Sequence, residues 1–438
     1  MKSKKQWLAS AAAAFLLSAC APSSPTGPQI NTDWRPNTAN TSVSSPSLHV
    51  KKVENLPDDF IFGMDASCVP ALEAGGVAYS DQTGQEKDVF QILRENGINY
   101  IRVRIWNDPF TADGHGYGGG NCDLENAIAI GKRATAQGMK LLVNFHYSDF
   151  WADPAKQMPP KAWKSFSIDE KTDALYRFTA ESLQKLVDAG VDVGMVQIGN
   201  ETNGALCGEK STEPGGWQRI TQLMQAGSKA VREICPNALV AVHFANPEKA
   251  GTYADYSHYL AQYGVDYDVF ASSYYPYWHG TMENLSQVLS HVALTYGKKV
   301  MVAETSYAFT PNDSDFFGNT IGASSEIQKQ YPFTQQGQAD MVRDLVDTLV
   351  NRTDHAIGVF YWEGTWISAG GNNHQENQAL WERYGSGWAA SYAAEYDPQD
   401  AGQWYGGCAV DNQAFFDSQG KATEALKVFA LLKNGNNI

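Results

Sequence analysis

Eight apolar runs, each about the length of a strand, alternate along this chain with stretches of helical periodicity. The runs are FIFGMD (60–65), NYIRVRIW (99–106), KLLVNFHY (140–147), GMVQIGN (194–200), ALVAVHF (238–244), YDVFASSYY (267–275), KVMVAET (299–305) and AIGVFYWE (356–363). Residues 86–97, 124–138, 173–190, 216–234 and 337–351 carry apolar side chains every three or four positions, and several of these stretches end in Gly or Asn, as helices do. Apolar strands alternating with helices indicate a parallel sheet covered by helices.

Eight such units predict an α/β fold of the (β/α)8 TIM-barrel type, with long loops at the carboxyl ends of the strands. The chain has 438 residues, 43% of them hydrophobic, which is enough for one large core. A doubly wound open sheet is the alternative. It is disfavoured because neither GxGxxG nor a phosphate-binding loop follows the first run.

Polar side chains gather at the carboxyl ends of these runs, where barrel enzymes place their active sites. The residues at these ends are Asp65, Arg102, Arg104, Asn144, His146, Asp149, Asn200, Glu201, His243, Tyr274, Tyr275, Trp278, Glu304, Trp362 and Glu363. A single residue of this kind is as often structural as functional. The repetition at all eight ends indicates a polar site at the mouth of the barrel.

Two carboxylates stand out, because Glu201 and Glu304 each come almost directly after an apolar run. The fourth and seventh strands lie on opposite sides of an eight-stranded ring, so their tips can face each other. Glycoside hydrolysis needs such a pair, with one carboxyl protonated and the other ionised. A separation of ~5–5.5 Å gives retention of configuration and ~6.5–9.5 Å gives inversion. Asn200 could then hydrogen-bond the sugar 2-hydroxyl.

At this point the chain resembles a known family, glycoside hydrolase family 53, the endo-β-1,4-galactanases of clan A. The resemblance covers residues 56 to 434. It is carried by GMDAS (63–67), VRIWNDP (103–109), GYGGGN (116–121), NFHYSDFWADPAKQ (144–157), QIGNETNG (197–204), SSYYPYWHG (272–280), VAETSYAFT (302–310) and YAAEYDPQDAGQWYGG (392–407). It implies a retaining endo-hydrolase that cuts β-1,4-galactan and type I arabinogalactan. The alternatives are another clan A glycanase, such as a mannanase or xylanase, and a non-catalytic glycan-binding lipoprotein.

The resemblance also implies roles for individual residues. Glu201 falls on the acid/base, with an expected raised pKa, and Glu304 falls on the nucleophile, which is expected to stay ionised. Positions that line the −1 subsite or orient the nucleophile are Arg102, His146, Asn200 and Tyr274. The sequence does not decide between Arg102 and Arg104 for one of these positions. Further expected sugar or supporting contacts are Asp65, Asp149, Trp278 and, as the platform under the −1 sugar, Trp362.

A calcium site is a second expectation, and its role would be structural, since catalysis needs no cofactor. The segment TPNDSDFFGNT (310–320) offers Asp313, Asp315 and Asn319, which are oxygen ligands that Ca²⁺ prefers. The resemblance implies an ion that links the loops after strands seven and eight, and Asp397 and Asp400 could complete the site. Phe317 stands where the family often has His. A solvated acidic loop is the alternative.

The N-terminus reads as a lipoprotein signal. Basic residues, an apolar segment and LSAC occupy residues 1–19 and Cys20, which predicts cleavage before Cys20 and a lipid anchor there. Residues 20–55, rich in Ser, Pro and Thr, predict a flexible tether, followed by a catalytic domain at 56–438. Ala21 favours the outer membrane or cell surface of a Gram-negative bacterium. A plain signal peptide is the alternative.

The net charge of −15 argues against nucleic acid as a partner, and no feature of the sequence indicates an oligomer, so we expect a monomer. Cysteines 68, 122, 207, 235 and 408 follow Cys20, and export predicts one or two disulfides. The expected pairs are Cys68 with Cys122 or with Cys408, and Cys235 is expected to be free. The long loop 363–412 carries four tryptophans, which predict either extra sugar subsites or a self-packed lid.

Overall fold

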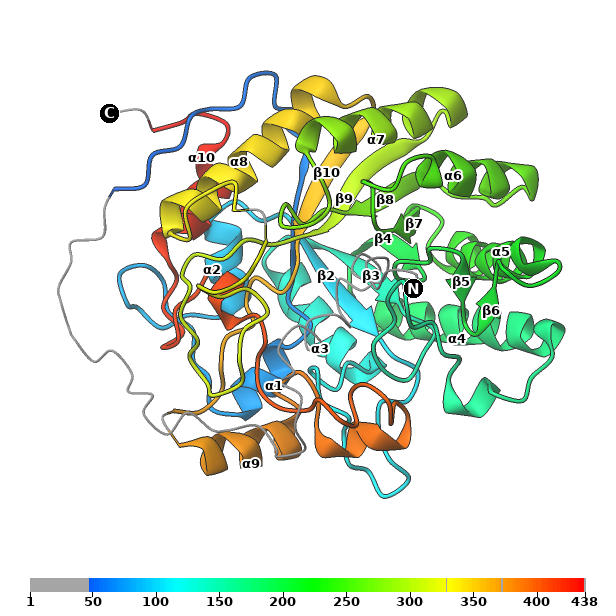
Figure 1. Cartoon of the computed structure of the whole chain (residues 1–438), viewed down its shortest axis with the longest axis horizontal. Helices are drawn as coiled ribbons and strands as arrows, with labels where there is room; N and C mark the ends of the chain where they lie inside the picture. The colour runs from blue at the N-terminus through cyan, green and yellow to red at the C-terminus, as the bar shows by residue number, and fades with distance from the viewer. Residues whose placement is uncertain (1–46, 328, 372, 437–438) are drawn as a thin grey trace, which may run out of the picture.

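The computed structural model describes residues 47–327, 329–371 and 373–436. Its centre is a closed barrel of parallel strands in the order β1-β10-β9-β8-β7-β4-β3-β2 (Figure 1). The strands are Ile61–Asp65 (β1), Tyr100–Ile105 (β2), Lys140–Phe145 (β3), Val193–Ile198 (β4), Leu239–Phe244 (β7), Val269–Ser273 (β8), Lys299–Thr305 (β9) and Ala356–Tyr361 (β10). Each corresponds to one of the eight apolar runs, and the predicted (β/α)8 barrel is confirmed.

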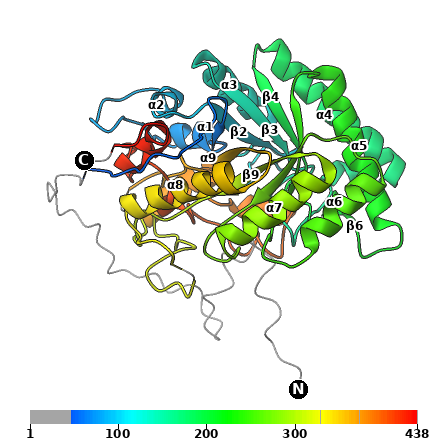
Figure 2. The same cartoon turned by 90° about the horizontal axis from the view of Figure 1, so that it is seen from above.

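Helices surround the barrel in both views (Figures 1 and 2). They are Val69–Ala74 (α1), Val89–Glu95 (α2), Leu124–Ala136 (α3), Ile168–Asp188 (α4), Gly216–Ile234 (α5), Thr252–Gln262 (α6), Met282–Tyr296 (α7), Gln335–Arg352 (α8), His374–Tyr384 (α9) and Val428–Leu431 (α10). Local capping fixes their starts. Ser167 and Glu170, for example, form a reciprocal capping box at the N-terminus of α4. Short 3-10 turns at 161–163, 391–395, 411–413 and 424–427 and a small hairpin, Ala205–Leu206 (β5) with Glu209–Lys210 (β6), complete the fold.

The barrel interior is filled by alternate side chains of its strands, mainly Ile61, Leu142, Met195, Ala241, Val269, Ala271, Met301, Ala303 and Phe360. Gly63 makes room in this layer, since a Cβ there would lie 1.9 Å from Cδ1 of Phe360. The opposite faces of the strands pack under the helices in a larger core. Both faces of the sheet are therefore buried, which explains why the strands read as continuous apolar runs.

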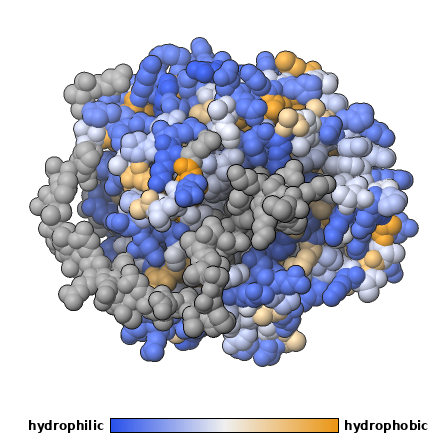
Figure 3. Space-filling model, in the orientation of Figure 1, coloured by the Kyte–Doolittle hydropathy of each residue, from blue (hydrophilic) through white to orange (hydrophobic). Residues whose placement is uncertain are grey.

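The long loop after β10 packs with residues that follow β1, β2 and β3 into a second apolar core on the carboxyl side of the barrel. Trp151 and Trp388 stack there with ring centroids 4.6 Å apart, and Trp366 and Trp381 are also buried. Of the four tryptophans in loop 363–412, only Trp404 remains exposed. Three of them are therefore packing residues, as the self-packed reading predicts. Figure 3 shows a mostly hydrophilic surface with separated small apolar spots.

The packed domain begins earlier than the predicted boundary at residue 56. Leu48, Val50 and Val53 are buried, and the segment runs past α8 and α10 (Figures 1 and 2). The amide of Val50 donates to Oδ1 of Asn436 at 2.7 Å, and the amide of Val53 donates to the carbonyl of Leu432 at 2.8 Å. The end of the predicted tether is thus part of the domain, whereas Cys20 and the signal segment lie outside the described residues. Within the described part, no helix is long and apolar enough to span a membrane.

The expected disulfides are not present. Cys68, Cys122, Cys207, Cys235 and Cys408 are all free and buried. The thiols of the candidate pairs have other partners: Cys68 accepts from Nη2 of Arg104 at 3.0 Å, Cys122 donates to the carbonyl of Gly119 at 3.2 Å, and Cys408 contacts the carbonyl of Trp366 at 3.7 Å. Burial raises the pKa of each of these three thiols, which keeps them protonated and unreactive.

Candidate active site

The sharp turn after β4 holds the Glu201 side chain at the mouth of the barrel. Gly199 has φ +94° and Glu201 has φ +48°, a left-handed conformation that is costly for a residue with a Cβ. Backbone contacts to β7 support it, since the amide of Thr202 donates to the carbonyl of His243 at 2.8 Å. The glutamate is therefore fixed within the barrel mouth, where it is 2% exposed.

Glu304, on β9, is held by two donors. Nη2 of Arg102 donates to Oε1 at 2.7 Å, and the hydroxyl of Tyr275 donates to Oε2 at 3.0 Å. Arg102 is fixed in turn by Asp65, whose Oδ2 accepts from Nη1 at 2.8 Å, and by Oδ1 of Asn200 at 3.0 Å. The choice between the two arginines is thereby resolved, because Arg102 is the one that contacts Glu304.

The tyrosine that contacts Glu304 is Tyr275 and not the predicted Tyr274. The hydroxyl of Tyr274 donates to the carbonyl of Gly280 at 3.1 Å and makes no hydrogen bond to Glu304, whereas Tyr275 does. Strand β8 ends at Ser273, so the side-chain alternation that the sequence suggests does not continue through 274 and 275. Tyr275 therefore replaces Tyr274 as the residue that orients Glu304.

Burial and neighbouring charge shift the two carboxyl groups to different extents. The pKa of Glu201 lies well above its usual value, because burial and the nearby charge of Glu304 disfavour its ionised form. The pKa of Glu304 is also raised by burial, but Arg102 and Tyr275 oppose that rise. Two donors hold Glu304 and a single hydroxyl, Ser273, donates to Glu201 at 2.6 Å. This asymmetry favours a protonated Glu201 beside an ionised Glu304, although Glu304 is less acidic than expected.

Asn200 and His146 are positioned by the loop after β3. Nδ2 of Asn200 donates to the carbonyl of Ala152 at 2.9 Å. Nδ1 of His146 accepts from Nε1 of Trp106 at 3.1 Å and from the amide of Ala152 at 3.2 Å, so the ring hydrogen resides on Nε2. Burial and the nearby arginines hold the pKa of His146 well below its usual value, and the imidazole is neutral.

Arg104 serves a neighbouring cluster. Its guanidinium pairs with Glu363 and lies 4.4 Å from the ring centroid of Trp151. Burial raises the pKa of Glu363 to about 7, and its backbone has φ +47°. Trp362, which directly precedes Glu363, is partly buried, and its ring centroid lies 6.3 Å from that of Trp151. The cluster therefore supports the floor beside the two carboxylates.

Of the remaining predicted residues, Asp149 is a buried structural residue and Trp278 is partly exposed. Both oxygens of Asp149 accept from backbone amides, those of Asp108 at 3.0 Å and Lys161 at 2.7 Å, so Asp149 joins two loops. Burial raises its pKa to about 6. Trp278 stacks on Tyr275 with centroids 5.8 Å apart and is partly buried. Its partly exposed ring therefore lies beside the tyrosine that contacts Glu304.

The acidic loop after β9 meets the loop after β10, but through a different residue than predicted. Ligand atoms of Asp313, Asp315 and Asp411 lie within 4.8 Å of one another, and Nδ2 of Asn319 donates to Asp411 at 2.6 Å. Oδ1 of Asn319 is buried without a partner. Burial and mutual repulsion raise the pKa of Asp315 well above its usual value. Clustered oxygens with an unpaired acceptor fit a hard divalent cation.

Asp397 and Asp400 do not belong to this cluster. Nζ of Lys156 contacts Asp397 at 2.7 Å and Asp400 at 2.6 Å. Both carboxylates thus pair with a lysine from the loop after β3. Asp411 is the residue from the loop after β10 that joins the cluster. It lies far from residue 313 along the sequence, so no local pattern indicates it.

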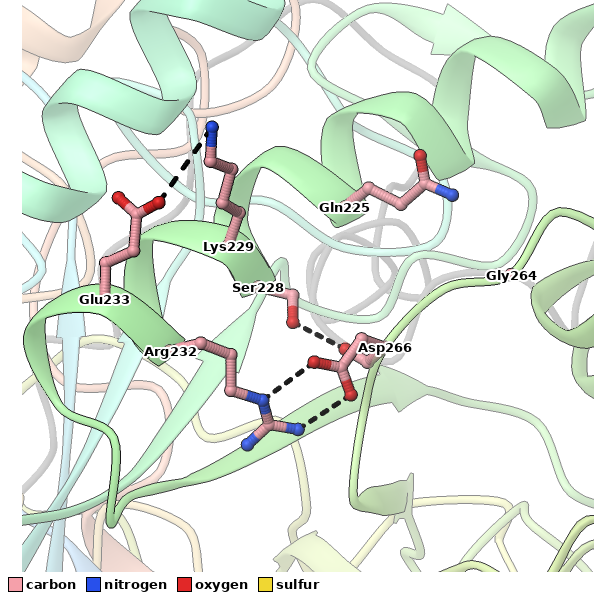
Figure 4. A pocket seen from close by; sticks show the side chains of 7 residues that line it. All are labelled: Gln225, Ser228, Lys229, Arg232, Glu233, Gly264 and Asp266. Atoms are coloured by element: carbon pink, nitrogen blue, oxygen red, sulfur yellow. Dashed lines mark hydrogen bonds and ion pairs between the residues drawn. The ribbon is translucent and has the colours of Figure 1, made fainter.

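A surface pocket lies between α5 and the segment that leads into β8. It is lined by Gln225, Ser228, Lys229, Arg232, Glu233, Gly264 and Asp266 (Figure 4). Its charges are paired with one another, Arg232 with Asp266 at 2.8 Å and Lys229 with Glu233 at 3.9 Å. It lies near the start of β8, at the end of the barrel away from the carboxylates, and no unpaired charge points to a ligand.

A closed barrel with two buried carboxylates at the ends of β4 and β9 has the architecture of a barrel glycosidase. Residues 61–429 match the model of glycosyl hydrolase family 53, and the chain belongs to this family. It is 54% identical over 397 residues to the endo-beta-1,4-galactanase of Bacillus subtilis (strain 168), covering 90% of this chain and 91% of that one.

Further relatives agree. The arabinogalactan endo-beta-1,4-galactanase of Cellvibrio japonicus is 34% identical over 344 residues, which cover 75% of this chain and 88% of the relative. Among solved structures, the GH53 catalytic domain of Ignisphaera aggregans superposes with a TM-score of 0.78 at 39% identity, over 88% of this chain and 99% of that one. The similarity therefore extends over the whole barrel and is not confined to a local motif.

Proposed function

We propose that this protein is an endo-acting, retaining glycoside hydrolase that cleaves β-1,4-galactosidic linkages in galactan and type I arabinogalactan. The carrying observation is the unequal pair of buried carboxyls: Glu304 is held by Arg102 and Tyr275, and Glu201 has the more strongly raised pKa. The high identity to an endo-beta-1,4-galactanase supports galactan as the substrate.

The reaction proceeds in two displacements. Ionised Glu304 attacks the anomeric carbon while Glu201 gives its proton to the departing glycosidic oxygen, so one C–O bond forms as another breaks. Glu304 has then lost its charge, which was one cause of the raised pKa of Glu201, and Glu201 has become ionised. Glu201 next removes a proton from water, whose oxygen attacks the same carbon and releases Glu304. Asn200 is placed to contact the sugar beside this carbon.

The test uses the chain without residues 1–20 on linear β-1,4-galactan, with products followed by chromatography. Wild type should release short galacto-oligosaccharides, and Glu304→Gln should release none. Early anomeric configuration, read by NMR, distinguishes retention from inversion. Cleavage of mannan or xylan in place of galactan would reject the proposed substrate, and binding of galactan without turnover would favour a glycan-binding protein.

We further propose a structural calcium ion held by Asp313, Asp315, Asn319 and Asp411, which join the loops after β9 and β10. The unpaired Oδ1 of Asn319 and the mutually repelling carboxyls support it. Phe317, where the family often has His, contributes no side-chain ligand. Its backbone amide donates to Oδ1 of Asp315 at 2.9 Å. The ion would fasten two loops and take no part in bond cleavage.

For the N-terminus we propose export and lipid attachment at Cys20, with the enzyme acting as a monomer at the outer membrane or cell surface. The basic, apolar and LSAC segments support this. Incorporation of labelled palmitate into wild type, but not into Cys20→Ser, is the expected result. Labelling of both proteins, or of neither, would reject it.

A further inference from the structure

A buried chain of hydrogen bonds leads from β7 through β8 to the acid/base carboxyl. Nε2 of His243 lies 2.9 Å from Oγ of Ser273, and Oγ of Ser273 lies 2.6 Å from Oε1 of Glu201. Both supporting side chains are fully buried. Neither residue takes part in the mechanism above, yet together they supply the side-chain hydrogen bond that Glu201 receives.

Arg102 fixes the direction of this chain from its far end. An arginine can only donate, and Arg102 contacts Oε1 of Gln197 through Nε at 3.3 Å and through Nη2 at 3.2 Å. The oxygen of the Gln197 amide therefore faces Arg102. Its nitrogen must then face His243, where Nε2 of Gln197 lies 3.0 Å from Nδ1 of the imidazole.

The imidazole nitrogen Nδ1 thus meets two groups that can only donate, the Gln197 amide nitrogen and the backbone N–H of Glu201 at 3.3 Å. Oδ1 of Asn200 lies 3.2 Å from the same nitrogen, but its two lone pairs already accept from Nη2 of Arg102 at 3.0 Å and from Nδ2 of Asn144 at 3.1 Å. Nδ1 is therefore the unprotonated nitrogen. Burial and the charge of Arg102 hold the pKa of His243 well below its usual value, so the ring is neutral and its one hydrogen is on Nε2.

The hydrogen on Nε2 of His243 points at Oγ of Ser273, which accepts it. Among the described residues, the side-chain partners of this hydroxyl are His243 and Glu201. The single hydrogen of Ser273 is then directed at Oε1 of Glu201. Because the carbonyl oxygen of a carboxylic acid is a better acceptor than its hydroxyl oxygen, this hydrogen bond favours Oε1 as the carbonyl oxygen and places the acidic proton on Oε2.

We propose that Ser273 and His243 are positioning residues that confine the catalytic proton of Glu201 to Oε2, the oxygen that Ser273 does not contact. The inference rests on the proposed function, because it assigns a task to Glu201 as acid/base. In the second displacement the same Ser273 hydrogen stabilises ionised Glu201. Without it, Oε1 and Oε2 would compete for the proton, and the carboxylate would lose a donor.

Other groups also act on Glu201, and their influence must stay constant in the test. The titratable and charged groups that face it are Glu304, Asp153, Arg102, His243, Tyr275 and Tyr253. Replacing Ser273 removes a hydrogen-bond partner of His243, a member of the same chain, and leaves the side-chain contacts of the other groups in place. A changed pH profile in a Ser273 variant therefore reports on the hydrogen bond itself.

The experiment compares pH profiles of wild type, Ser273→Ala, Ser273→Thr and Ser272→Ala. In Ser273→Ala, the alkaline limb of kcat/KM on galactan should move up by about one to two pH units, because a hydrogen bond to the charged form is lost. The acidic limb of kcat on a dinitrophenyl β-galactobioside, for which Glu201 acts only as base, should move in the same direction. Ser273→Thr keeps the hydroxyl and should keep both limbs.

Ser272→Ala is the matched control. The neighbouring hydroxyl contacts Tyr253 at 2.6 Å and the backbone carbonyl of Ser273 at 2.9 Å. It contacts neither the side chain of Ser273 nor that of Glu201, so both limbs should stay in place. If Ser273→Ala does not fold, Ser273→Cys, a weaker donor, should shift the limbs the same way. Unmoved limbs in a folded Ser273→Ala or Ser273→Cys would overturn the proposal.

A second readout separates this inference from the proposed function. Imidazole nitrogen NMR shifts, assigned by loss of one signal in His243→Gln, should show a neutral ring protonated on Nε2. Protonation on Nδ1 would reverse the chain and overturn the inference even in an active galactanase. Absence of galactan cleavage with the Nε2 form present would instead reject the substrate while leaving the hydrogen-bond direction intact.

Discussion

Removing the hydroxyl of Tyr275 should weaken catalysis by a predictable amount. Tyr275 donates to Oε2 of Glu304 at 3.0 Å and is 7% exposed. A hydrogen bond to a charged group contributes about 1.5–3 kcal/mol, which corresponds to about a 10- to 150-fold change in rate if it is lost where it is needed. Tyr275→Phe should therefore lower kcat/KM on galactan within that range.

The same substitution should also shift the pH dependence of kcat/KM in a defined direction. The Tyr275 donor lowers the pKa of Glu304, opposing the rise caused by burial. Its removal should raise that pKa, and because Glu304 acts in its ionised form, the acidic limb of kcat/KM should move to higher pH. Initial rates on galactan across the pH range, with thermal unfolding as a check on folding, measure both effects.

Tyr274→Phe provides the control, since its hydroxyl donates to the carbonyl of Gly280. That variant should keep the acidic limb in place and lose little activity. Equal losses in the two variants, or a stationary acidic limb in Tyr275→Phe, would refute the assignment of Tyr275 as the residue that orients Glu304.

Three further outcomes are expected. Arg102→Lys should lower kcat/KM by about 100-fold or more, because a lysine cannot replace the contacts to Glu304, Asp65 and Asn200 together; rates near wild type would contradict this. Chelation should lower the Tm of wild type and of Asp400→Asn but not further lower that of Asp411→Asn; equal sensitivity of all three would place the calcium elsewhere. Leu48→Ala should destabilise the domain by roughly 2 kcal/mol, measured by urea unfolding, and no loss would return residue 48 to the tether.

The barrel and its two carboxylates were predictable because both depend on order along the chain. Each strand is an uninterrupted apolar run, and Glu201 and Glu304 follow such runs directly. The same reasoning placed Arg102 on the correct strand but could not choose it over Arg104. Residues 102 and 104 are alternate positions of one strand, so both side chains point into the barrel. They differ only in which carboxylate each contacts, Glu304 for Arg102 and Glu363 for Arg104.

Other features depend on contacts that no local pattern carries. Ser273 is a small polar residue at a strand end, and nothing in its neighbourhood marks it as the donor to Glu201. Asp411 meets Asp313 across nearly a hundred residues. The sequence favours Tyr274 over Tyr275, and the structure reverses this order because β8 ends at Ser273, before both tyrosines. The expected disulfides are wrong for a related reason, since the sulfurs of Cys68, Cys122 and Cys408 contact other groups that no local pattern indicates.

The clamp of residues 48–53 against the C-terminal segment has a mechanical consequence. Any pull that enters the domain from the chain before residue 47 first meets the hydrogen bonds of residues 48–53, which include those of Leu48 and Val50 with Asn436 and that of Val53 with Leu432. These bonds lie ahead of β1, which begins at Ile61 and helps to close the barrel beside β10. They tie the segment to α8 through Gln336 and to the residues after α10, so we expect a pull from this side to break them before it strains the strand that carries Asp65.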